Sequence, residues 1–148
     1  MNDMEIRLVQ ESFTKVAPIA ETAAELFYDR LFELDGDLKP LFHSDLQQQG
    51  RLLMKMVGTA VDHLTDLDTL VPIVQRLGAR HKVYGVAPSH YDTVGQALLW
   101  TLEQGLGDHF TPEVASAWAN AYGLLSGVMM EAAGYEQVSG RVPELSVT

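Results

Sequence analysis

The chain has 148 residues, of which 47% are hydrophobic and 20% charged, the size and composition of one globular domain with a substantial core. Its formal charge of −10 and its scattered Lys and Arg residues argue against binding to nucleic acid or to an anionic membrane. The lack of cysteine excludes disulfides, thiolate catalysis and cysteine-ligated metal sites. The charged N-terminus does not read as a signal peptide, and no apolar run reaches membrane-spanning length. We therefore expect a cytoplasmic protein.

Two amphipathic helices are predicted at the start of the chain. The first is capped by Asn2 or Asp3 and ends at Pro18. The second covers about residues 19–34, and Tyr28 lies beside its apolar face. Both helices show apolar residues at three- and four-residue steps, which are Ile6, Val9, Phe13 and Val16 in the first and Ala20, Ala23, Ala24, Phe27, Leu31 and Leu34 in the second.

A break at Gly36 and Pro40 leaves room only for a short helical turn before a third helix, expected at about residues 46–64. The apolar stripe of this helix consists of Leu53, Met56, Val57, Ala60, Val61 and Leu64. Gln49 lies four residues before Leu53, so it opens the stripe as a polar residue. This spacing favours Gln49 over Gln47 and Gln48 as the inward-facing glutamine.

The fourth helix is predicted to begin near Pro72, because proline is tolerated in a first turn. His81 lies four residues after Leu77 and seven after Val74, on the buried face. Further helices are expected at about 89–106 and, after Thr111-Pro112-Glu113, from about 112 to 135. No segment shows the alternation of a strand, so we predict one all-α domain over residues 1–137 and a mobile tail over 138–148.

Three polar side chains thus lie on or beside apolar stripes of different helices: Tyr28, Gln49 and His81. Burying a polar group costs a few kcal/mol unless it is satisfied. One explanation is a hydrogen-bond network among the three. The other is a ligand between them, and a haem fits, with iron on the imidazole and the other two side chains as donors to an iron-bound ligand.

Other chemistries find less support in the residues. Zinc normally takes three or four protein ligands, and the remaining histidines show no suitable spacing. No Gly-x-Ser-x-Gly motif or glycine-rich phosphate loop is present. A haem protein and a haemless helical domain both remain open at this point.

Several segments together resemble the bacterial single-domain globins, which are related to the globin domain of flavohaemoglobins. They are Leu26-Phe27-Tyr28-Asp29-Arg30-Leu31-Phe32, Pro40-Leu41-Phe42, Arg80-His81-Lys82-Val83-Tyr84-Gly85-Val86, His90-Tyr91 with Val94-Gly95, and Ala117-Trp118 with Ala121-Tyr122-Gly123. The resemblance implies the helical globin fold around a haem b.

The resemblance also implies roles for six residues. His81 corresponds to the proximal iron ligand, and Phe42 to the phenylalanine that stacks on the haem. Tyr28 and Gln49 correspond to the distal hydrogen-bond donors, Leu53 to the apolar residue over the iron, and Tyr91 to the tyrosine behind the proximal histidine.

The chain departs from the flavohaemoglobin pattern at the proximal glutamate. The expected position falls on Ala133, and Glu131 is two residues early, or about 200° away on a helix. We therefore expect a weaker electron push from the histidine to the iron than a carboxylate partner would give. The flavin and nicotinamide domains are also missing from the sequence, so turnover is expected to need a separate NAD(P)H-dependent reductase.

The resemblance implies reversible binding of oxygen, nitric oxide or carbon monoxide at a five-coordinate ferrous iron, in oxygen transport. An alternative is nitric oxide detoxification by dioxygenation. A sensory role is less favoured, because no output domain is seen in the sequence. The expected assembly is a monomer or a homodimer.

Overall fold

The computed structural model describes residues 1–41, 45–83, 88–132 and 134, without the side chains of residues 41 and 80–83. The described residues form helices and no strand, which confirms the predicted all-α class. The α-helices are α1 (Asp3–Val16), α2 (Ala20–Leu34), α3 (Leu46–Asp62), α4 (Leu67–Val83), α5 (Pro88–Leu106) and α6 (Pro112–Ala132), and the 3-10 helices are η1 (Ala17–Ile19), η2 (Gly36–Leu41) and η3 (Gly107–His109). None of the helices in this described part is long and apolar enough to cross a membrane.

Side-chain caps fix the helix starts that the sequence predicts. The Asn2 side chain accepts a hydrogen bond from the Glu5 amide at 2.8 Å, and the Glu5 carboxylate accepts one from the Asn2 amide at 3.2 Å. Asp45 caps α3 by accepting from the Gln47 amide, and Thr111 caps α6 by accepting from the Val114 amide. Each cap supplies an acceptor for a backbone N–H that the first turn leaves without one.

The predicted start of the fourth helix is wrong. α4 begins at Leu67, so Pro72 lies inside it and is not in its first turn. Asp66 starts the helix earlier, because its backbone carbonyl accepts from the Leu70 amide at 3.1 Å. Pro72 is exposed, so water can solvate the carbonyl of Asp68 that lacks a helical donor. α6 ends at Ala132, slightly before the expected end.

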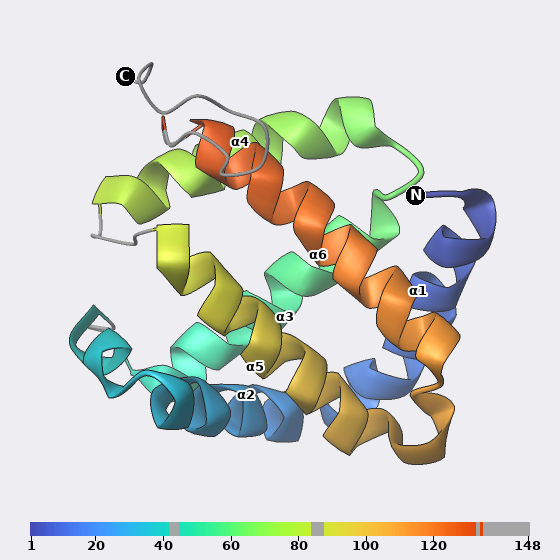
Figure 1. Cartoon of the computed structure of the whole chain (residues 1–148), viewed down its shortest axis with the longest axis horizontal. Coiled ribbons are helices and arrows are strands. Elements are labelled where there is room, and N and C mark those ends of the chain that lie inside the picture. The colour runs from blue at the N-terminus through green and yellow to red at the C-terminus, as the bar shows by residue number, and fades with distance from the viewer. Residues whose placement is uncertain (42–44, 84–87, 133, 135–148) are drawn as a thin grey trace.

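The helices cross obliquely in pairs (Figure 1). The most extensive contacts join α4 to α6, α2 to α5, α1 to α6 and α2 to α3. Although α3 and α4 follow one another in the chain, they are not a closely packed pair in the described part. They share the turn near Thr65 and diverge from it, which separates the start of α3 from the end of α4 (Figure 1).

Two clusters of buried side chains make up the core. The larger cluster joins α1, α2, α3, α4, α5 and α6, with Ala23 as the member from α2, and the smaller one lies between α2, η2, α3 and α5 around Phe27 and Tyr28. In the larger cluster the indole of Trp118 donates a 2.8 Å hydrogen bond to the Ser12 hydroxyl, which itself donates to the Leu8 carbonyl. Trp118 is therefore a packing residue that links α6 to α1.

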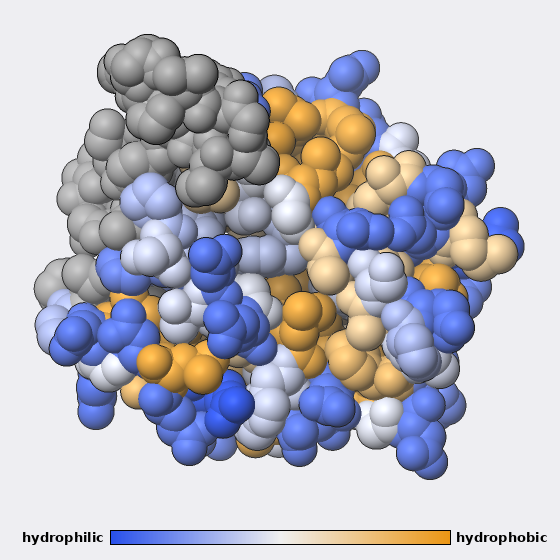
Figure 2. Space-filling model, in the orientation of Figure 1, coloured by the Kyte–Doolittle hydropathy of each residue, from blue (hydrophilic) through white to orange (hydrophobic). Residues whose placement is uncertain are grey.

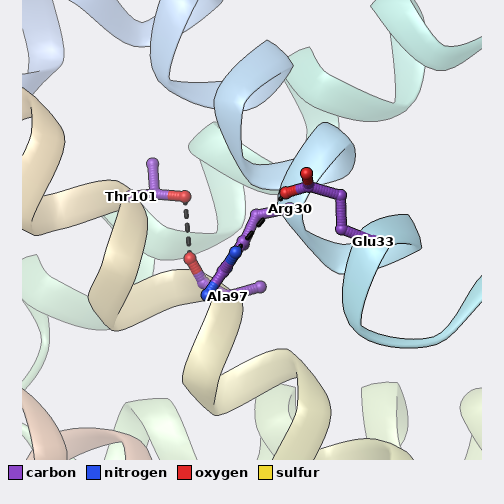
Figure 3. A network of polar contacts seen from close by, with 4 residues as sticks. All are labelled: Arg30, Glu33, Ala97 and Thr101. Atoms are coloured by element: carbon purple, nitrogen blue, oxygen red, sulfur yellow. Dashed lines mark hydrogen bonds and ion pairs between the residues drawn. The ribbon is translucent and has the colours of Figure 1, made fainter.

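The contact between α2 and α5 includes a charged side chain. The Arg30 guanidinium lies 5.2 Å from the centre of the Trp100 ring, a cation–π geometry, and 3.5 Å from the Glu33 carboxylate. Thr101, the residue after Trp100 on α5, donates a 2.8 Å hydrogen bond from its hydroxyl to the Ala97 carbonyl (Figure 3). On the face shown in Figure 2, apolar residues appear in separate places between hydrophilic ones.

Candidate functional site

Tyr28 is a buried phenol on α2, with 6% of its surface exposed. The neighbouring Phe27 meets its ring edge-on at a centroid distance of 5.1 Å, and Phe32 stacks on it at 6.1 Å. This apolar setting disfavours the phenolate, so burial raises the pKa of Tyr28 to about 12. Like any phenol, the hydroxyl is protonated at neutral pH and can donate a hydrogen bond.

α3 comes unusually close to α2 at Gly50, the residue after Gln49. A Cβ atom on Gly50 would lie 2.8 Å from the Cβ of Ala24 and 3.9 Å from Cε2 of Tyr28. Glycine is needed here because any side chain would separate the two helices. Of the three consecutive glutamines, Gln49 is half-buried, whereas Gln47 and Gln48 are exposed. The structure thus brings Gln49 and Tyr28 to the same crossing of α2 and α3.

Leu53 joins the same region from the next turn of α3. It is half-buried and packs against the cluster that contains Tyr28. Leu53 also lines a small internal cavity between α1, α2, α3 and α5, together with Phe13, Val16, Ala23, Phe27, Met54, Val57, Leu98, Thr101 and Leu102. The hydroxyl of Thr101 bonds to its own helix, so this cavity presents a largely apolar wall.

The predicted proximal histidine belongs to α4. The backbone of His81 is helical and lies in the last turn, while its side chain is outside the described residues. α4 rests mainly on α6, and its buried residues Leu70 and Val74 belong to the larger cluster. Among the described residues α3 and α4 have no extensive contact, and Figure 1 shows the end of α4 apart from the start of α3.

Tyr91 is buried on α5, with 5% of its surface exposed. Its backbone carbonyl accepts a 2.6 Å hydrogen bond from the Tyr122 hydroxyl of α6. The Tyr122 ring lies so close to α5 that a Cβ on Gly95 would be 2.8 Å from its Cε2 atom. Burial, and secondarily the neighbouring Tyr91 and Asp92, raise the pKa of Tyr122. The hydrogen bond from the Tyr122 hydroxyl thus links the first turn of α5 to α6.

Some predictions fall on residues outside the described part of the chain. These are Phe42, the side chain of His81, Ala133 and the tail over residues 138–148. Glu131, which is two residues before Ala133, is exposed at the end of α6.

Within the described ranges, no group of three or more His, Asp or Glu side chains is placed to hold a metal ion. His63 is half-buried, and its Nδ1 lies 2.8 Å from the Thr59 carbonyl, which is a structural role at the end of α3. His109 is exposed in η3.

Two glycines were missed as parts of the site, Gly50 and Gly95. Both glycines permit a close approach of two helices. The apolar pattern of one helix does not reveal such an approach, because the atoms that an added Cβ would meet belong to another helix. The available signal was their place in the chain, since Gly50 follows Gln49 and Gly95 lies one turn after Tyr91.

Known proteins resemble this chain both in sequence and in fold. The globin family model matches residues 25–129. A flavohaemoprotein of Rhodopirellula baltica is 33% identical over 142 residues, covering 93% of this chain and 35% of the relative, and one of Bacillus subtilis is 30% identical, covering 85% and 32%. The chain thus spans about a third of the length of these relatives.

A solved structure, a hexacoordinated haem protein from an anhydrobiotic tardigrade, superimposes with a TM-score of 0.81 at 17% identity, covering 90% of this chain and 95% of that one. At this level of identity the likeness concerns the fold. The family model covers most of the chain, including α3, α4 and α5 entirely. The chain therefore belongs to the globin family.

Proposed function

We propose that this globin binds haem b through His81 and holds a diatomic ligand, foremost oxygen, on the side of Tyr28 and Gln49. Membership of the globin family and the similarity to flavohaemoproteins support haem binding. Haem would supply an iron with one position open to a small ligand. His81 would hold the iron, and Tyr28 and Gln49 would donate hydrogen bonds within an apolar enclosure.

The donor set of the chain agrees with haem. A metal ion held by protein alone needs several ligands, and the described residues hold no such group. A haem iron takes four nitrogens from the porphyrin, so one histidine suffices. The divergence of α3 from α4 supports the same arrangement, because it keeps the Gln49 end of α3 from packing against the His81 end of α4.

One observation carries the proposed ligand chemistry: Tyr28 is a buried phenol at the close crossing of α2 and α3, next to the turn of α3 that carries Gln49. A phenol is protonated at neutral pH, so its O–H can donate a hydrogen bond, and the apolar surroundings disfavour the phenolate. Gln49 adds a second donor from the facing helix, next to the close crossing at Gly50. Two donors favour a ligand that draws electron density from iron, so they strengthen the binding of oxygen more than the binding of carbon monoxide.

The dissociation rate of oxygen from the ferrous protein tests this function. One hydrogen bond contributes about 1–1.5 kcal/mol, so Tyr28→Phe is expected to speed dissociation about tenfold. Gln49→Ala is expected to speed it too, whereas Gln48→Ala, at the exposed neighbouring position, is the matched control. Carbon monoxide dissociation should change much less in all three variants. Equal oxygen rates in Tyr28→Phe and the unmodified protein would reject the proposed role of the hydroxyl.

A second candidate function is nitric oxide dioxygenation, favoured by the 30–33% identity to flavohaemoproteins. In this reaction nitric oxide, oxygen and one electron give nitrate, so each turnover consumes one electron. The donor would be an NAD(P)H-dependent reductase. Mixing the oxygenated protein with nitric oxide and a reductase distinguishes the two functions, because repeated nitrate formation indicates an enzyme and a single equivalent indicates a binding protein.

A further inference from the structure

The backbones of α4 and α6 touch at Gly78. A Cβ atom on Gly78 would lie 2.6 Å from the Cα atom of Met129 and 2.8 Å from its carbonyl carbon, and it would also clash with the carbonyl oxygen. All three are backbone atoms, so no change of side-chain rotamer can relieve the overlap. Any residue larger than glycine must therefore move α4 relative to α6.

This contact lies close to the proposed iron ligand. Gly78 precedes His81 by three residues, which is less than one turn and about 4.5 Å along the helix axis. α4 has its most extensive contact with α6, and Gly78 is fully inside that contact as a buried residue. The contact at Gly78 therefore fixes the position of the His81 backbone relative to α6.

We propose that Gly78 is a positioning residue that sets the reach of the His81 imidazole towards iron. This inference rests on the proposed function, in which His81 is the axial ligand. If α4 moves away from α6, the backbone of His81 moves with it. The distance and the tilt between the His81 imidazole and a haem held by the rest of the fold would then change. The strength of the axial bond should then depend on residue 78, although residue 78 touches neither haem nor ligand.

The test compares Gly78→Ala with Gly123→Ala, an exposed position on α6 where an added Cβ meets nothing within 4 Å. Resonance Raman spectra of the reduced, ligand-free holoproteins report the iron–histidine stretching band. We expect the band to be displaced in Gly78→Ala and unchanged in Gly123→Ala. A folded Gly78→Ala protein with the unmodified band would overturn the inference.

A second pair of variants separates positioning from a general loss of structure. In His81→Gly with added imidazole, the axial ligand is no longer tied to α4. Introducing Gly78→Ala there should leave the iron–imidazole band where it is. An equal displacement with free imidazole would refute positioning, because the effect would then reach the iron through the pocket instead of the tether.

Two further results are informative. If Gly78→Ala does not fold, Val74→Ala replaces it, because the loss of buried packing one turn earlier loosens α4 without an overlap. A displaced band is then expected, whereas an unchanged band argues against the inference. If His81→Gly without imidazole keeps the histidine band, the proposed function itself is wrong, and this outcome is recognised independently of residue 78.

Discussion

The close crossing of α2 and α3 at Gly50 gives a quantitative prediction. In Gly50→Ala the new methyl group would lie 2.8 Å from the Cβ of Ala24, whereas carbon atoms pack at about 3.5–4.0 Å. The helices must therefore separate by about 1 Å. Overpacking of this kind destabilises a protein by about 1–3 kcal/mol. Alanine in a helix interior is favoured over glycine by about 0.5–1 kcal/mol, so a net loss of about 0–2.5 kcal/mol is expected.

The double variant Ala24→Gly/Gly50→Ala isolates the steric overlap. It moves the methyl group from one helix to the other, so the crossing regains its space and the helix propensities cancel. Urea unfolding of the haem-free proteins gives the four free energies of the cycle. We predict a favourable coupling energy of about 1–3 kcal/mol and a double variant close to the unmodified protein. Additive effects, within about 0.5 kcal/mol, would refute the contact.

Three more predictions concern other parts of the fold. Ser12→Ala removes the hydroxyl that accepts the hydrogen bond of the buried Trp118 indole, so the free energy of unfolding is expected to fall by about 1–3 kcal/mol. The melting temperature should fall by roughly 2–4 °C per kcal/mol, and Thr14→Ala, at an exposed position, is the control. Gly107 has φ +55°, so Gly107→Ala should destabilise by about 1–2 kcal/mol in urea unfolding, unlike Gly36→Ala, because Gly36 does not have a positive φ. An added Cβ meets nothing within 4 Å at either position, so the pair of variants isolates the backbone conformation. The folded-state pKa of Tyr28 is raised from 10.0 to about 12, so its contribution to the free energy of unfolding is present below pH 10 and lost as pH rises through 12. Tyr28→Phe should therefore lose less stability than the unmodified protein between about pH 9 and pH 12.

Each of these predictions has a contradicting result. An unchanged melting temperature in Ser12→Ala would mean that water replaces the lost acceptor. Equal effects at Gly107 and Gly36 would show that the positive φ is not required. Identical alkaline titrations of stability with and without the Tyr28 hydroxyl would show that its pKa is not raised in the folded protein.

The apolar spacing predicted the helices because each helix buries one face, and the caps at Asn2 and Thr111 marked their starts. Pro72 misled the prediction of α4, since an exposed proline is tolerated inside a helix when water solvates the freed carbonyl. In both cases the local chemistry of the chain decided the helix ends.

The candidate site was only partly predictable. Tyr28 was found because a phenol beside an apolar stripe needs an explanation, and it is buried as expected. Gly50 and Gly78 were not found, because their importance depends on Ala24 and on the Met129 backbone, which lie on other helices. The apolar periodicity of a sequence describes one helix at a time, whereas the distance between two packed helices depends on the residues of both.

A haem titration of the apoprotein, followed in the visible spectrum, tests most directly whether His81 holds a haem. We predict a Soret band that saturates at one haem per chain, and in His81→Gly a loss of the axial histidine signature that added imidazole restores. No Soret band in the unmodified protein, or the same axial signature in His81→Gly without imidazole, would contradict the account.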